Sequence, residues 1–190
     1  GSTAMTYDTW GRQLTYTITP ANGGTAETTT TVYNALGDVA KVVTPKSTTI
    51  NTYDGTDANG NTEHRGLLTK TETTVGTFTT TAQAAYDATG QLVLEKLPAG
   101  IQRETSYDLT GELVDQQYKG PGPDGLTEWF AWSITANASG QIISEISPEV
   151  TAGALAEATT ADVRYSYDKA GRLTRVSDTT QDQCTTRNYT

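Results

Sequence analysis

The sequence predicts an all-β protein, an antiparallel meander of repeated β-hairpins. Three observations carry this prediction. The pattern Tyr-[Asp/Asn]-x-x-Gly occurs five times in 190 residues. Threonine, which favours half-solvated strands over helices, occurs 39 times. Polar and apolar residues alternate between the turns, as at Leu14, Tyr16 and Ile18, and this is the period of a strand.

Each position of the pattern has a physical role in a hairpin. Asp or Asn in the first place of a type I turn accepts hydrogen bonds from the turn's own amides, and Gly in the fourth place takes the left-handed conformation that closes a bulged hairpin. The tyrosine and the aliphatic residue two places after the glycine become cross-strand neighbours on one face. We therefore assign structural roles to Tyr7, Asp8, Gly11, Tyr33, Asn34, Gly37, Tyr86, Asp87, Gly90, Tyr107, Asp108, Gly111, Tyr167, Asp168 and Gly171.

Two further copies are irregular. Tyr53 and Asp54 open a stretched copy over 53–66, whose glycine is Gly66. A degenerate copy over 136–140 keeps Gly140 and is expected to lose both the tyrosine and the acid. Tyr189 begins another copy near the end of the chain. With Pro or Gly turns such as LPAG (97–100) between copies, residues 6–190 are interpreted as about seven repeats.

Three segments interrupt the repeats: 55–66, 120–132 and 147–162. The first carries oxygen side chains that suit a calcium ion. The EF-hand spacing fails there, because glycines would fall at the first and last ligand positions, so we expect a solvated loop. The weak calcium candidates are Asp54, Asp57, Asn59, Asn61 and Glu63.

The other two interruptions are not expected to carry chemistry. Residues 120–132 are interpreted as a Pro/Gly loop leading into Trp129, Phe130 and Trp132. We expect these rings to fill the gap beside the degenerate copy, and the alternative is that Trp129 and Trp132 bind a sugar or a partner. The Ala-rich segment 147–162 allows a short helix.

Composition narrows the class of protein. The formal charge of −9 argues against partners held by phosphate neutralisation, such as nucleic acid, and against insertion into or adsorption on anionic membranes. One cysteine, Cys184, forms no internal disulfide. The length suffices to bury a core. Residues 1–5 resemble a cloning remnant, so we expect the chain to be a piece of a larger protein.

Signatures of catalysis are missing. His64 is the single histidine and lies in a polar insertion, and Cys184 lies in a polar tail. Phosphate-binding, nucleophile-elbow and zinc-protease motifs are absent from the sequence. The repeated aspartates already have a turn-forming role. We expect no catalytic residue and no cofactor.

The stretches YDATGQL, LPAGIQRETSYDLTGEL and YSYDKAGRLTRV resemble YD repeats, also called RHS repeats. These occur in bacterial rearrangement-hotspot proteins, wall-associated proteins, C components of insecticidal toxin complexes and teneurins. The resemblance extends from Tyr7 to Tyr189. It implies a β-solenoid in which the sheet spirals into a hollow shell that encloses a C-terminal toxin. No stretch resembles the family's autoproteolytic region, so no catalytic residue is carried over.

The expected function is therefore a structural segment of the shell of a large secreted or cell-surface polymorphic-toxin protein. An extracellular glycan-binding or partner-binding adhesion module is the alternative, and an enzyme acting alone is the least favoured. The expected partners are the neighbouring repeats and the enclosed toxin, with a cell-surface glycan under the alternative.

The free strand edges of the isolated chain are expected to drive self-association, because unpaired N–H and C=O groups template further strands. Sedimentation should give a mass that rises with concentration. A monomer mass that stays constant with concentration would contradict this prediction.

Overall fold

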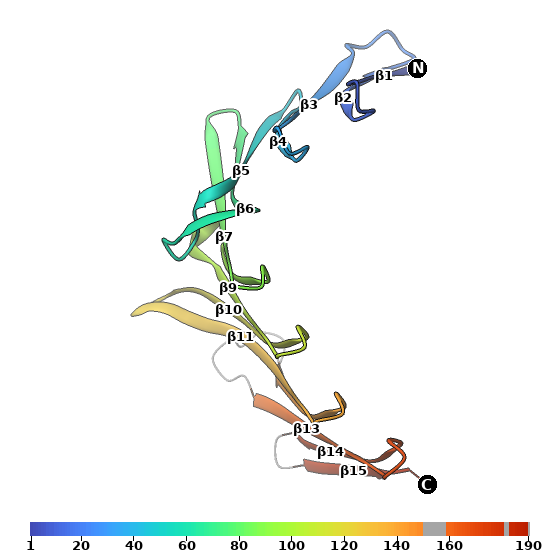
Figure 1. The fold of residues 1–190 in the computed structure, drawn as a ribbon, viewed down its shortest axis with the longest axis vertical. Coiled ribbons are helices and arrows are strands. Elements are labelled where there is room, and N and C mark those ends of the chain that lie inside the picture. Colours follow the sequence, from blue (N-terminus) through green and yellow to red (C-terminus); the bar gives the residue numbers. More distant parts are fainter. Residues whose placement is uncertain (150–158, 181–182, 190) are drawn as a thin grey trace. The chain divides into compact units, whose positions relative to one another are not determined.

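A computed structural model describes residues 1–149, 159–180 and 183–189, and it is all-β there, as predicted (Figure 1). The described residues form strands in an unclosed sheet and a 3₁₀ turn, Pro98–Gly100. The strands are β1 (Ser2–Tyr7), β2 (Gln13–Thr19), β3 (Glu27–Tyr33), β4 (Val39–Val43), β5 (Ser47–Thr56), β6 (Thr62–Val75), β7 (Phe78–Tyr86), β8 (Leu92–Lys96), β9 (Gln102–Tyr107), β10 (Leu113–Gly122), β11 (Gly125–Ala136), β12 (Ile142–Glu149), β13 (Thr159–Tyr167), β14 (Leu173–Thr180) and β15 (Gln183–Asn188). They are hydrogen-bonded in chain order, which is the predicted meander.

The chain divides into two compact units, which are described separately. The first comprises residues 1–90 and 95–98, and the second comprises 91–94 and 99–190. Within the first unit successive strands pair antiparallel from β1–β2 to β6–β7. Within the second unit the same holds for β9 to β15.

The motif hairpins share a register. The position of the tyrosine pairs with the second residue after the glycine, and a bulge lies beside the pair, because the turn adds one residue on one strand. The observed pairs are Tyr7–Gln13, Tyr33–Val39, Tyr53–Leu68, Tyr107–Leu113, Ala136–Ile142 and Tyr167–Leu173. The predicted cross-strand neighbours are therefore observed.

The sheet buries little apolar surface. Among the described residues, the buried apolar side chains are Ala58 and Ala85, while most strand residues are half-buried. The length would suffice to bury a core, but the described part of the chain does not bury a large one. A single sheet has no second layer to cover it.

Threonines instead link neighbouring strands along the sheet, which is how a half-solvated sheet is stabilised. Their hydroxyl oxygens lie within hydrogen-bond distance in the pairs Thr6–Thr15 (2.6 Å), Thr17–Thr28 (2.9 Å), Thr49–Thr73 (3.1 Å) and Thr74–Thr79 (2.8 Å).

The predicted interruptions are mostly strand. Residues 55–66 and 120–132 form hairpins that continue β5–β6 and β10–β11, so the loop interpretations are wrong (Figure 1). Their polar residues pair across strands as readily as apolar ones in a sheet with two solvated faces. Of 147–162, both ends belong to β12 and β13, and the helix expected at its centre falls on 150–158, outside the described residues. Residues 2–5, expected to be a cloning remnant, belong to β1.

Candidate functional site

The Asp-x-x-Gly turns share one hydrogen-bond pattern. In the first turn, Asp8 Oδ1 accepts from the backbone N–H groups of Trp10 and Arg12, both at 2.9 Å. The N–H of Gly11 donates to the Asp8 carbonyl at 3.1 Å, and Gly11 has a φ of 79°. The same pattern holds the turns that begin at Asn34, Asp57, Asp108, Asn137 and Asp168, and Asp87 accepts from Thr89.

Two of these turns correct the sequence interpretation. The degenerate copy does not lose its turn-forming side chain, because Asn137 offers the same Oδ1 acceptor as an aspartate. The inserted segment contains a turn of its own at Asp57–Gly60, with a φ of 86° at Gly60. No tyrosine precedes this turn, so the five-residue pattern did not detect it.

In five of the copies the tyrosine forms a hydrogen bond that sequence reasoning missed. Its hydroxyl donates to the backbone carbonyl of the preceding copy, at the second residue after that copy's glycine. We call this contact the tyrosine latch. Five latches are observed: Tyr33 to Gln13 (3.0 Å), Tyr53 to Val39 (3.2 Å), Tyr86 to Leu68 (2.8 Å), Tyr107 to Leu92 (3.1 Å) and Tyr167 to Ile142 (2.8 Å).

A signal for the latch was present in the sequence. The slot holds Tyr and never Phe in the regular copies, although Phe packs equally well against an aliphatic neighbour. A hydroxyl retained on a sheet face needs a hydrogen-bond partner. Its partner is a main-chain atom 14 to 25 residues away, so pattern analysis within one copy does not reveal it.

A second contact joins successive turns. The glutamines that follow Gly90 and Gly140 each reach the glycine of the next copy. Gln91 Nε2 donates to the Gly111 carbonyl at 2.9 Å, and Gln141 Nε2 donates to Gly171 in the same way at 2.9 Å. A Cβ at Gly111 would lie 3.2 Å from the Gln91 amide nitrogen, so the small residue leaves room for this contact.

Both contacts are interrupted between the copies at Tyr107 and Ala136. Ala136 has no hydroxyl, and nothing lies within 4 Å of a Cβ built on Gly140. The backbone pairing of β10 with β11 still continues there. We call this junction, between residues 107–113 and 136–142, the seam.

Supplying the missing hydroxyl at the seam is expected to stabilise the second unit. Ala136→Tyr places a donor near the Leu113 carbonyl and should raise the free energy of unfolding by about 1 kcal/mol in urea titrations. Ala136→Phe adds the ring without the hydroxyl. Comparing it with Ala136→Tyr separates the contribution of packing from that of the hydrogen bond. Ala138→Tyr, on the exposed turn of the same copy, is the matched control and should change little. An Ala136→Tyr variant no more stable than Ala136→Phe would rule out a latch at this position.

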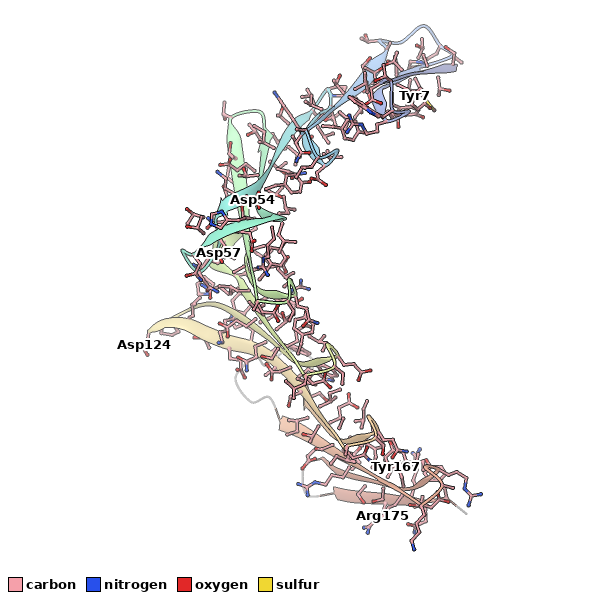
Figure 2. All side chains as sticks on the ribbon, in the orientation of Figure 1. Tyr7, Asp54, Asp57, Asp124, Tyr167 and Arg175 are labelled. Atoms are coloured by element: carbon pink, nitrogen blue, oxygen red, sulfur yellow. The ribbon has the colours of Figure 1, made fainter. Side chains whose placement is uncertain are left out.

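The inserted hairpin, residues 54–66, contacts Ala84 of β7 and Lys96 (Figure 2 marks the hairpin by Asp54 and Asp57). The Ala58 N–H donates to the Ala84 carbonyl at 3.0 Å, and Lys96 Nζ donates to the Ala58 carbonyl at 2.6 Å. Ala85 is fully buried, and side-chain alternation directs it to the face opposite Tyr86. The hairpin is therefore hydrogen-bonded to β7 and to Lys96.

An ion pair fixes the base of the inserted hairpin. Glu63 is 5% exposed, and its carboxylate accepts from Arg65 Nε at 2.8 Å and Nη2 at 2.6 Å. Arg65 Nη1 also donates to the carbonyls of Asp87 (2.7 Å) and Ala88 (3.0 Å). One guanidinium thus joins the hairpin to the turn that follows β7.

The calcium candidates are used in other ways. Asp57 Oδ1 accepts from the N–H groups of Asn59 and Asn61, and Asp54 Oδ1 accepts from that of Gly66 at 2.6 Å. Glu63 is paired with Arg65. Within residues 1–149, 159–180 and 183–189, no three acid, His or Cys side chains gather as a metal site. The carboxylates of Asp54, Asp57 and Glu63 therefore stabilise the hairpin through these contacts.

The Glu63–Arg65 pair predicts a pH dependence. The Arg65 side-chain hydrogen bonds lower the pKa of Glu63 from 4.5 to about 2. Because the pKa in the folded state lies below that in the unfolded state, the stabilisation is complete above pH 4.5 and is lost as pH falls toward 2. We expect the Glu63 carboxyl carbon to titrate near pH 2 by NMR. A midpoint near 4.5 would show that the pair does not form in solution.

The two candidate binding tryptophans each contact another residue of the sheet. Trp129 lies on Gly120, where a Cβ would come within 2.0 Å of its ring, and it is 40% exposed. Trp132 is half-buried and donates from Nε1 to Glu145 Oε1 at 3.0 Å. Phe130 packs edge-on against Tyr118 with centroids 6.2 Å apart. The expected filling role fits Trp132 better than Trp129.

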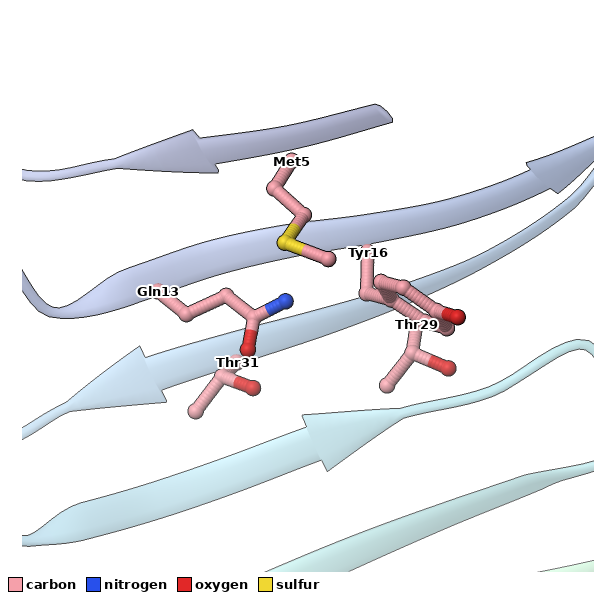
Figure 3. A pocket seen from close by; sticks show the side chains of 5 residues that line it. All are labelled: Met5, Gln13, Tyr16, Thr29 and Thr31. Carbon is pink, nitrogen blue, oxygen red and sulfur yellow. The ribbon is translucent and has the colours of Figure 1, made fainter. Parts of the chain in front are cut away.

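A shallow hollow lies across β1 to β3 (Figure 3). It measures about 360 Å³ and is lined by Met5, Gln13, Tyr16, Thr29 and Thr31. None of these side chains is an acid, a base or an activated nucleophile. The residues that line the hollow therefore provide no reactive group.

Of the two residues considered for chemistry, only His64 has a described side chain. The His64 side chain is exposed, and its backbone N–H donates to Glu63 Oε1 at 2.9 Å. Cys184 lies in β15, and its side chain is outside the described part. The described segments contain no helix that is long and apolar enough to span a membrane.

No family model and no curated protein sequence matches the chain. Solved structures match it at low identity. TcdB2-TccC3 without its hypervariable C-terminal region has a TM-score of 0.59 at 16% identity, covering 96% of this chain and 11% of that chain. TcdB2-TccC3 gives 0.58 at 15% identity, covering 96% and 12%. The chain shares the fold of a segment of TcdB2-TccC3.

The complex named TcdB2-TccC3-Cdc42 also matches, with a TM-score of 0.51 at 15% identity over 96% of this chain and 11% of that chain. The chain thus spans about a tenth of the length of TcdB2-TccC3. At this identity the likeness establishes the repeated-hairpin sheet, and the activity and partners of the longer protein are separate questions.

Proposed function

We propose that the chain is a structural segment of the hollow β-shell of a much larger secreted or cell-surface protein, which encloses its own C-terminal toxin. The observation that carries the proposal is the tyrosine latch. Each latch joins a copy to the copy before it, so a hairpin is complete only beside its neighbours. Such repeats stabilise one another along the chain and need no globular core.

The likeness to TcdB2-TccC3 supports the same proposal. The chain matches about a tenth of that protein over 96% of its own length. One matching structure lacks a hypervariable C-terminal region, which is consistent with a constant shell followed by a variable segment. We propose no catalytic role for this segment.

The test uses the parent polypeptide in its source organism. An antibody against this chain should detect an extracellular band far larger than 20.3 kDa, together with release of a separate C-terminal piece. Protease treatment of the intact parent should spare that piece until the shell is denatured. A small intact surface protein without a released piece would overturn the proposal.

An adhesion module is the second candidate, and Trp129 is the observation that favours it. Its ring is 40% exposed beside the tip of the β10–β11 hairpin, where Figure 2 marks Asp124. Exposed aromatic rings can stack on sugars. Under this candidate, Trp129→Ala abolishes a tryptophan fluorescence change caused by added oligosaccharide. Under the shell proposal, oligosaccharide leaves the fluorescence unchanged.

A further inference from the structure

A carboxylate between two aromatic side chains lies on the second unit. Glu145 of β12 accepts from Trp132 Nε1 of β11 at 3.0 Å and from the Tyr165 hydroxyl of β13 at 3.2 Å. All three side chains are half-buried. Glu145 pairs in register with Ile134 and Val163, which lie two residues from Trp132 and Tyr165. Strand alternation therefore puts the three on one face. We call them the acid–aromatic cluster.

Among the described residues, no cation balances the charge of Glu145. Both of its hydrogen-bond donors are neutral groups, and no Lys or Arg in the described part of the chain forms an ion pair with it. Burial and then the Glu145 hydrogen bond raise the pKa of Tyr165, as expected beside an uncompensated carboxylate.

The same three types of side chain, a tryptophan, a tyrosine and a carboxylate, contact an arginine elsewhere in this protein. In the first unit, the Arg12 guanidinium lies 4.9 Å from the Trp10 ring centroid and 4.5 Å from that of Tyr33. Its Nε donates to Asp8 Oδ2 at 2.6 Å. A tryptophan, a tyrosine and a carboxylate together thus hold one guanidinium through cation–π and charge-assisted contacts. The acid–aromatic cluster has the same composition and lacks the guanidinium.

We propose that the acid–aromatic cluster binds an arginine side chain of a basic polypeptide segment. The formal charge of −9 on the chain favours a basic partner, and a planar guanidinium suits both the carboxylate and the aromatic rings. The inference rests on the proposed shell function in one respect: under that function, the basic segment that supplies the arginine belongs to the enclosed polypeptide. The site itself belongs to this chain alone.

The test titrates the full 190-residue chain with the peptide acetyl-Gly-Arg-Gly-Arg-Gly-amide. NMR resolves the indole N–H signals of the three tryptophans, and a Trp132→Phe variant assigns one of them. We expect a saturable shift of the Trp132 signal, with Trp10 unchanged. Glu145→Gln should weaken binding about tenfold or more, which corresponds to about 1.4 kcal/mol. Glu128→Gln removes the same charge from an exposed site and should change affinity little.

Three results would overturn the proposal. The first is no shift of the Trp132 signal at millimolar peptide. The second is an equal loss of affinity in Glu128→Gln, which would indicate unspecific attraction to the acidic chain. The third is a shift with neutral oligosaccharide and none with the peptide. If Glu145→Gln does not fold, the titration of the wild-type chain alone decides whether the cluster binds the peptide. If the peptide does not bind, the shell proposal is unaffected, because the shell proposal is tested on the parent protein.

Discussion

Arg65→Gln is expected to detach the inserted hairpin from β7 and β8. The substitution removes the partner of Glu63, a carboxylate that is 5% exposed, and leaves a buried charge without compensation. It also removes both hydrogen bonds to the carbonyls of Asp87 and Ala88. Amide hydrogen exchange over residues 54–66 should accelerate roughly tenfold or more, while exchange in β9 and β10 stays unchanged.

The chain supplies a matched control for this prediction. Asp162 and Arg164 have the same spacing along a strand and form an ion pair of 2.9 Å, but the Arg164 side chain is 72% exposed. Exposed pairs contribute little to stability, so Arg164→Gln should leave exchange rates nearly unchanged. If both variants behave alike, burial of Glu63 is not what holds the hairpin.

Local structure was predictable from the sequence because its determinants are local. The acid and the glycine of each turn lie three residues apart and act on the same turn, as Asp8 and Gly11 illustrate. The cross-strand pairing of Tyr107 with Leu113 follows directly from that turn. A repeated pattern then extends one correct hairpin to the whole chain.

Longer-range structure was not predictable in the same way. The turn at Asp57–Gly60 lacks the preceding tyrosine, so the inserted hairpin was interpreted as a solvated loop. Ala58 of this hairpin contacts Ala84 and Lys96, which lie 26 and 38 positions further along the chain. The acid–aromatic cluster likewise joins three strands that one residue pattern does not link.

The structure also explains why a chain with so small a core can keep a regular sheet. A hairpin in water is marginally stable, so each copy depends on bonds to its neighbours. Backbone pairing, threonine pairs and latches all run along the sheet, and none requires a second layer. Stability should therefore be sensitive to contacts between copies, and the latch is the most specific of these.

Removing a latch is expected to destabilise the chain in two separable steps. Tyr86 is half-buried, and its hydroxyl donates to the Leu68 carbonyl at 2.8 Å. Burial raises the pKa of this tyrosine, so the hydroxyl stays protonated as a donor. Tyr86→Phe loses only the hydrogen bond and should lower the free energy of unfolding by about 1 kcal/mol. Tyr86→Ala also loses the ring and should lower it by about 3 kcal/mol.

Tyr7 is the control that isolates the latch from tyrosine as such. It occupies the same motif position, but its hydroxyl donates to Met5 Sδ at 3.1 Å on its own strand and reaches no preceding copy. Tyr7→Phe should therefore be nearly neutral in urea unfolding, whereas Tyr86→Phe should not. If Tyr7→Phe and Tyr86→Phe lower the free energy of unfolding equally, the hydroxyl acts within its own hairpin. In that case successive copies do not depend on one another through the latch.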